Sequence, residues 1–143
     1  MGKIDGGLRA LFRANVPGDW TSIESGTTGG GIPDSNYCIR GAEGWVEHKQ
    51  AEGWAVTLRP EQVGWIMRRV RNGGRVWVAV RRANAGGPRR GEAVDELWLL
   101  RGRLAVEAKA GGLRPLDGAP GVHCWHHGPS AWDWRAVARV LAG

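Results

Sequence analysis

The run Val76-Trp77-Val78-Ala79-Val80 constrains the fold more than any other part of the chain. Five consecutive apolar residues, three of them valine, predict a strand that is covered on both faces, as at the centre of a sheet. The preceding residues 60–72 predict a helix, because apolar residues recur there at helical spacing: Val63, Ile66, Met67 and Val70. A helix that leads into a buried strand predicts an α/β fold, with a central mixed β-sheet flanked by helices.

Residues 31–50, which precede that helix, predict a β-hairpin. Its strands cover 35–40 and 45–50, and the turn is Arg40-Gly41-Ala42-Glu43-Gly44. If residue 40 faces residue 45, then 38 pairs with 47 and 36 pairs with 49. Since strand side chains alternate, this register puts Asp34, Glu47 and Lys49 on one face of the sheet. A slip of one residue would send Asp34 to the other face.

The remaining segments predict smaller elements within one domain, which a length of 143 residues fits. We expect a helix over 5–15, a short strand over 20–23, a second hairpin from 96–101 and 103–109 with its turn at Gly102, an irregular stretch over 110–129, and a helix over 131–142 opened by a capping box of Ser130 and Asp133. The core would cover about 5–82, with 96–142 as an elaboration. The loop 83–94 is either a DNA-contacting segment or a solvated connector.

Asp34, Glu47 and Lys49 together fit the metal-dependent hydrolysis of a phosphodiester. That reaction needs a hard cation on the phosphate, an activated water and neutralisation of the charge that develops. Magnesium prefers a few carboxylates and waters, so Asp34 and Glu47 are the expected ligands, with the backbone carbonyl of His48 as a further one. Lys49 would orient or deprotonate the attacking water, because its compact ammonium group can approach a water or a phosphate.

The Gly-rich segment before the hairpin adds further candidates. Glu24 lies in the approach to the same site and is a candidate additional ligand of the metal. Thr27 and Thr28, together with the glycines at 29–31, would let a phosphate backbone come close.

Spacing alone is weak evidence for this site, because the chain contains a second copy of the pattern. Asp95, Glu107 and Lys109 repeat nearly the same spacing within the predicted second hairpin. The alternative for either copy is a surface hairpin that carries a Glu/Lys pair.

The charge of the chain predicts a polyanionic partner. There are 20 Lys and Arg residues against 14 Asp and Glu, a net charge of +6. Nearly all of the basic residues are arginine, which is the better fork for phosphate. A codon bias towards arginine is the alternative source of this excess. The expected DNA contacts are Arg68, Arg69, Arg81 and Arg82, with a solvated basic face as their alternative.

Two cysteines make no disulfide framework, and the N-terminus lacks the apolar stretch of a signal peptide. No apolar run approaches the ~20 residues that span a bilayer. We therefore expect a cytoplasmic protein without a membrane partner, in the host cytoplasm if the chain is phage-encoded. The cluster His123-Cys124-Trp125-His126-His127 suggests zinc, but four ligand types so close together rarely form one tetrahedral site, so a structural or incidental role is favoured.

The motifs GIPD, WVEHK, RPEQ and VWVAV, within residues 20–82, resemble the PD-(D/E)xK nuclease superfamily. In that family a Pro-Asp begins one strand, Glu-x-Lys lies on the next, and a helix and a strand follow. The resemblance is nearest to the phage and archaeal-like Holliday-junction resolvases and the related virus-type replication-repair nucleases. It implies a restriction-endonuclease-like core, with Asp34 and Glu47 as metal ligands and Lys49 as the catalytic lysine.

The resemblance also implies two accessory residues. Gln62, in the PEQ that opens the predicted helix, matches a frequent polar position near the lysine. The family's upstream glutamate usually lies on the first helix, which has none here, so Glu24 is the best match. Residues 96–143 depart from the family core, and the resemblance implies no role for them.

The function that these observations predict is an endonuclease that resolves four-way (Holliday) junctions. It would use Mg²⁺, for which Mn²⁺ can substitute, and act as a homodimer, since two symmetric cuts need two active sites. Binding of branched double-stranded DNA would depend on backbone charge and shape. Three alternatives stay open: a related nuclease for flaps, nicks or forks; a catalytically silent DNA-binding module; and a small zinc-binding interaction protein.

Overall fold

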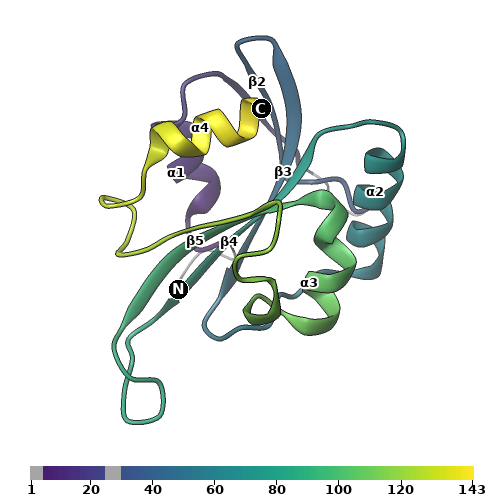
Figure 1. Cartoon of the computed structure of the whole chain (residues 1–143). Coiled ribbons are helices and arrows are strands. Elements are labelled where there is room, and N and C mark those ends of the chain that lie inside the picture. Colours follow the sequence, from purple (N-terminus) through teal and green to yellow (C-terminus); the bar gives the residue numbers. More distant parts are fainter. Residues whose placement is uncertain (1–4, 25–29) are drawn as a thin grey trace.

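The computed structural model describes residues 5–24 and 30–143, and these form an α/β fold around one six-stranded sheet (Figure 1). The strands are β1 (Asp19–Ser22), β2 (Ser35–Ile39), β3 (Ala42–Ala51), β4 (Val76–Asn84), β5 (Val94–Arg101) and β6 (Val122–Trp125). Their order in the sheet is the order in the chain. The sheet is mixed: β3 and β4 are parallel, and the other neighbouring pairs are antiparallel.

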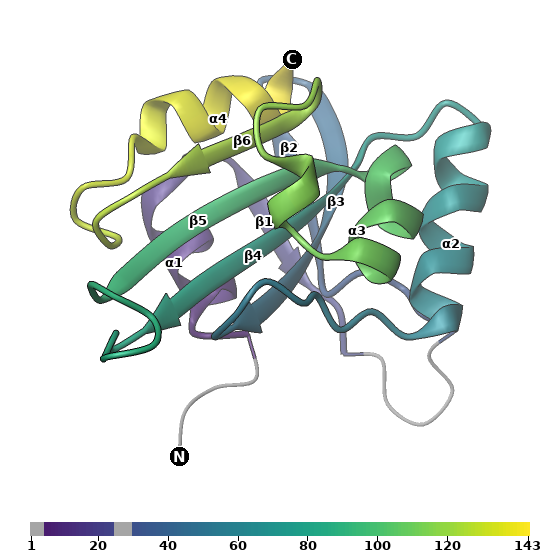
Figure 2. The ribbon, with the colours of Figure 1, turned by 60° about the horizontal axis from the view of Figure 1, so that its bottom comes forward.

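Helices cover both faces of the sheet (Figure 2). They are α1 (Leu8–Asn15), α2 (Pro60–Arg71), α3 (Ala105–Gly111) and α4 (Trp134–Ala142). One core cluster holds residues of α2 and α3, and the other holds residues of α1 and α4, so each pair of helices packs on its own face. α2 is the crossover that the parallel pair β3–β4 requires. No helix among residues 5–24 and 30–143 is long and apolar enough to cross a membrane.

The predicted central strand is confirmed. Every residue of Val76–Val80 is buried, and the run begins β4. Val78 and Val80 pack under α2 and α3, whereas Trp77 and Ala79 pack under α1 and α4. The run is continuously apolar because both of its faces meet a core. The expected helix before it is α2, and the helix over 5–15 and the strand over 20–23 correspond to α1 and β1.

The first hairpin forms, but its predicted register is wrong. Trp45 pairs with Asn36 instead of residue 40, a shift of four residues. The turn is the shortest one available: Ile39 pairs with Ala42 across Arg40 and Gly41, whose φ angles are 51° and 83°. Two residues with positive φ make the tight turn that suits the twist of a hairpin, and this determines the register. A shift of four is an even number, so it leaves the face of every side chain unchanged.

The predicted second hairpin is also wrong in its second half. β5 ends at Arg101, and the chain continues as a 3₁₀ turn, Gly102–Leu104, and then as α3. Leu104, Ala105 and Ala108 are buried, and this spacing belongs to one face of a helix, not to an alternating strand. The partner of β5 on its outer side is β6, which lies in the stretch expected to be irregular.

The last helix begins later than expected. α4 starts at Trp134, and Asp133 is its N-cap, with the carboxylate accepting a hydrogen bond from the Ala136 N–H. Asp133 therefore caps the helix directly, in place of the predicted capping box with Ser130.

Candidate active site

Glu47 and Lys49 lie next to each other on one side of β3. They are two residues apart, and Lys49 Nζ is 3.6 Å from Glu47 Oε2. Both side chains are largely covered, with exposed fractions of 7% for Glu47 and 17% for Lys49. Val46 points to the opposite core, as the alternation of a strand requires. A carboxylate and an ammonium group therefore share a partly enclosed site under α2.

Gln62 connects this site to the first turn of α2. Its side-chain oxygen accepts hydrogen bonds from Lys49 Nζ at 3.1 Å and from the Arg59 N–H at 2.9 Å. The second bond belongs to the capping arrangement that begins α2. Because Gln62 is itself buried, the capped helix end holds the ammonium group of Lys49 in place.

Asp34 immediately precedes β2 and reaches β3 at the level of His48. Its Oδ2 accepts a hydrogen bond from the His48 backbone N–H at 3.2 Å, and its Oδ1 lies 2.5 Å from His48 Nδ1. The imidazole is buried and packs edge-on against Phe12 of α1. The N–H and C=O of a strand residue point to the same side, so the His48 carbonyl also faces the edge where Asp34 lies.

The surroundings of Glu47 favour the neutral, protonated form of its carboxyl group. Burial, followed by the negative charge of Asp34, raises the pKa of Glu47 to about 7, although Lys49 and Arg59 act in the opposite direction. A carboxyl group that is buried beside a second carboxylate lacks sufficient positive charge around it. A bound cation would supply that charge, and perturbed carboxylates of this kind concentrate at functional sites.

Few of the described side chains are available to a metal ion at this place. In the part of the chain that the structure describes, no group of three or more His, Cys, Asp or Glu side chains is arranged to hold a metal ion. Two carboxylates, Asp34 and Glu47, and the His48 carbonyl leave several positions for water. Magnesium is usually bound in this way, by one or two carboxylates and retained waters.

Glu24 does not join the other predicted ligands. Its side chain is 87% exposed, and its carboxylate lies 3.9 Å from the guanidinium group of Arg9 on α1. Thr27 and Thr28, the predicted phosphate contacts, lie outside the described residues.

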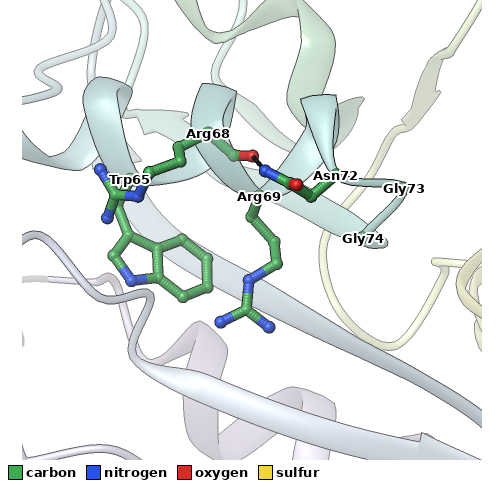
Figure 3. A pocket seen from close by; sticks show the side chains of 6 residues that line it. All are labelled: Trp65, Arg68, Arg69, Asn72, Gly73 and Gly74. Atoms are coloured by element: carbon green, nitrogen blue, oxygen red, sulfur yellow. Dashed lines mark hydrogen bonds between the residues drawn. The ribbon is translucent and has the colours of Figure 1, made fainter.

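Arg68 and Arg69 lie near the end of α2, beside a surface cavity of about 460 Å³ (Figure 3). The guanidinium carbon of Arg69 is 4.6 Å from the ring centroid of Trp65 and 5.4 Å from that of Trp45. Both arginines are exposed, and cation–π contact orients Arg69 without using its N–H groups. This pair can therefore meet a phosphate.

Arg81 and Arg82 are engaged within the fold. Arg81 makes two hydrogen bonds to Asp95, at 2.9 and 2.7 Å, and a third to the Gly6 carbonyl. Arg82 donates to Glu96 at 2.8 Å and is 11% exposed. Arg81 and Arg82, which were expected to contact DNA, therefore hold β4 to β5.

The cluster over 123–127 is divided between β6 and the residues after it. Cys124 Sγ lies 3.8 Å from His126 Nε2, and His126 Nδ1 lies 3.2 Å from Glu96 Oε2. His123 stacks on Trp125. These contacts fit the structural role that the sequence favours for the cluster.

No family model matches this chain, and no curated protein matches it. Sequence analysis assigned only the carbonyl of His48 to the site and missed its imidazole, which binds Asp34. Alternation along β3 directs His48 to the opposite core from Glu47 and Lys49, so it gave no signal for a contact with Asp34.

Proposed function

We propose that this protein is a metal-dependent, structure-selective DNA endonuclease that resolves four-way junctions. The observation that supports the proposal is that Asp34, just before β2, binds His48, the residue between Glu47 and Lys49 on β3, and that its negative charge acts on Glu47. Burial, followed by the charge of Asp34, raises the pKa of Glu47, and Gln62 holds Lys49 beside it. A carboxylate and a lysine in such a site match the requirements of phosphodiester hydrolysis.

The order of elements supports a restriction-endonuclease-like core. Asp34 stands immediately before β2, Glu47 and Lys49 lie on β3, and α2 and β4 follow. This is the arrangement that the resemblance to the PD-(D/E)xK nucleases implies for GIPD, WVEHK, RPEQ and VWVAV. β5, β6, α3 and α4 extend and cover the sheet beyond that core.

The residues have separate roles in this proposal. Asp34, Glu47 and the His48 carbonyl would hold Mg²⁺, or Mn²⁺ in its place, which supplies a Lewis acid on the scissile phosphate and a water of lowered pKa. Lys49 orients the attacking water and offsets the negative charge that develops on the phosphate. Gln62 keeps the Lys49 ammonium group directed at the site.

The proposed substrate and the proposed homodimer rest on the resemblance to junction resolvases and on the net positive charge of the chain. Symmetric cleavage of a junction needs two active sites, which a two-fold homodimer supplies. Arg68 and Arg69, with the net charge of +6, favour contact with the backbone of branched double-stranded DNA in the cytoplasm.

Cleavage assays test the proposal directly. Wild-type protein should cut a four-way junction in Mg²⁺ or Mn²⁺ and cut flaps, forks and linear duplex less efficiently. Asp34→Asn and Lys49→Ala should remove that cleavage while the variants still bind the junction. Full cleavage by either variant would rule out this site, and a preference for flaps or forks would change the substrate but keep the reaction.

A catalytically silent DNA-binding module is the second candidate, and one observation favours it. Both carboxylate oxygens of Asp34 are bound to His48, and Glu24 faces Arg9 instead of the site. A module of this kind would bind junctions with similar affinity in EDTA and in Mg²⁺, and would cleave none of the four substrates in either metal.

A further inference from the structure

A second concave surface lies at the carboxyl ends of the parallel strands β3 and β4, and nothing in the proposed reaction uses it. It encloses about 510 Å³. Four arginines line it: Arg82 from β4, Arg89 and Arg90 from the β4–β5 connection, and Arg114 from the turn after α3. The β4–β5 connection projects beyond the sheet in both views of the ribbon (Figures 1 and 2).

Trp54 is the platform on which two of these arginines rest. The guanidinium carbon of Arg82 is 3.7 Å from the ring centroid of Trp54, and that of Arg114 is 5.7 Å away. The indole is fixed in turn by edge-to-face packing on Trp98. A cation–π contact holds a guanidinium group by its face and leaves the N–H groups at its edge free to donate. Arg82 already donates to Glu96, so exposed Arg114 is the arginine that this platform presents to a ligand.

The carboxylates at the pocket do not neutralise it. Arg90 lies 3.7 Å from Glu52, but both side chains are well exposed, and exposed pairs of this kind are weak. Asp117 is the other acidic residue of the lining. Arg89 and Arg114 have no ion-pair partner within residues 5–24 and 30–143, so the pocket retains positive charge that a ligand can use.

The pocket lies on the same side of the sheet as Glu47 and Lys49. Trp54 packs into the core under α2 and α3, the side that Lys49 also faces through its bond to Gln62. Glu52 follows Lys49 by three residues and lies one residue past the end of β3, which corresponds to at most about 10 Å of extended chain. The same distance covers about three steps of duplex DNA at ~3.4 Å each.

We propose that this pocket is a phosphate-binding subsite that takes the DNA backbone about three nucleotides from the point of cleavage. Phosphodiester is the ligand class because the donors are guanidinium groups and the cavity is open and polar. The phosphate chemistry stands on the pocket alone, while its assignment to DNA rests on the proposed function.

The test compares two double variants that lose the same charge. Arg89→Ala/Arg90→Ala alters the pocket, and Arg135→Ala/Arg139→Ala removes two exposed arginines from α4, on the other face of the sheet. Binding of a fluorescein-labelled four-way junction is followed by anisotropy in EDTA, at several salt concentrations. Thermal melts check that both variants are folded.

We expect the pocket variant to bind the junction at least tenfold more weakly than wild type at about 0.1 M salt. A plot of the logarithm of its association constant against the logarithm of the salt concentration should have a slope that is shallower by about 1.8. The control variant should stay within about twofold of wild type, since it loses no phosphate contact. Equal affinities and slopes for the two variants would overturn the subsite. Failure of the nuclease proposal would appear elsewhere, as undiminished cleavage by Asp34→Asn, and would leave this comparison intact.

A competition experiment tests whether the pocket takes the phosphate of a DNA backbone, of a free nucleotide or of inorganic phosphate. Unlabelled duplex, a mononucleotide and inorganic phosphate are each added to the labelled complex at equal phosphate concentration. Displacement by the duplex alone supports the backbone assignment. If the mononucleotide displaces the junction as efficiently as the duplex does, and does not do so in the pocket variant, the pocket is a free-nucleotide site and the backbone assignment is overturned.

Discussion

Asp34 is bound to His48 through both of its carboxylate oxygens, one to the backbone N–H and the other to the imidazole Nδ1. The imidazole is buried against Phe12, in the core beneath α1 and α4. Glu47 and Lys49 lie on the other side of β3, under α2. The orientation of Asp34 therefore depends on the core of one face of the sheet, whereas its proposed partners depend on the other.

His48→Ala should weaken the site without removing a proposed ligand side chain. The substitution removes the hydrogen bond that orients one carboxylate oxygen of Asp34. We therefore expect the Mg²⁺ concentration for half-maximal cleavage to rise by about 10–100-fold. His48→Asn, which keeps an N–H donor, should recover part of the loss. The measurement is the Mg²⁺ dependence of single-turnover junction cleavage.

Phe12→Leu is the control for this prediction. It loosens the same core and removes the ring that packs on the imidazole, but it does not touch Asp34. Stability should fall by about 1 kcal/mol while the Mg²⁺ dependence stays near that of wild type. If Phe12→Leu shifts the Mg²⁺ dependence as much as His48→Ala does, the imidazole acts only by packing.

The central layer of the fold could be predicted because its signals are local. The apolar run that begins β4 and the apolar stripe of α2 need no knowledge of distant residues. The face shared by Glu47 and Lys49 was also predictable, since a register error of four residues preserves alternation. Asp34 precedes β2, and its carboxylate binds His48 of the opposite core instead. The length of the turn was not, because it depends on whether Arg40 adopts positive φ.

The parts that sequence analysis missed depend on packing between distant segments. α3 was mistaken for a strand because a helix of seven residues whose buried members are alanines carries little periodic signal. Only the burial of Leu104, Ala105 and Ala108 reveals it. The pocket around Trp54 could not be anticipated either. It assembles residues from β4, the β4–β5 connection and the turn after α3, which only the tertiary fold brings together.

Lys49→Ala and Lys109→Ala test which of the two similar motifs is functional. Lys49→Ala should lower single-turnover cleavage by about 10²–10⁴-fold, the usual contribution of a group that assists proton transfer. Lys109 lies on α3 and donates a hydrogen bond to the Leu58 carbonyl, so its truncation should cost about 1 kcal/mol of stability. Cleavage by folded Lys109→Ala should remain within about twofold of wild type. The reverse pattern would assign the chemistry to the second motif.

Glu47→Gln should stabilise the metal-free protein at high pH. The pKa of Glu47 is raised to about 7 in the folded state from its ordinary 4.5, so the folded state binds more protons than the unfolded state between these values. Its contribution to stability is therefore lost as the pH rises from about 4.5 to 7, by roughly 3 kcal/mol. We expect the Tm of Glu47→Gln to exceed that of wild type at pH 8 in EDTA, and to differ little at pH 4.5.

Magnesium should reverse that order. Ionised Glu47 is a proposed ligand, so Mg²⁺ should raise the Tm of the wild type at pH 8 and leave that of Glu47→Gln unchanged. Glu107→Gln, an exposed carboxylate on α3, is the control and should follow wild type in both conditions. If Mg²⁺ does not change the Tm of the wild type at any pH, the result would argue against a metal site at Glu47.

The cluster around Cys124 should hold no stoichiometric zinc. Burial, followed by the negative charges of Glu96 and Asp117, raises the pKa of the Cys124 thiol to about 12, and only a thiolate is a good zinc ligand. Elemental analysis of protein purified without chelator should give well under one zinc per chain, and Cys124→Ser should fold and cleave like wild type. In a Cys38→Ser background, Cys124 should react with iodoacetamide far more slowly than free cysteine at pH 8.5. One zinc per chain, lost in Cys124→Ser together with thermal stability, would make the cluster a metal site.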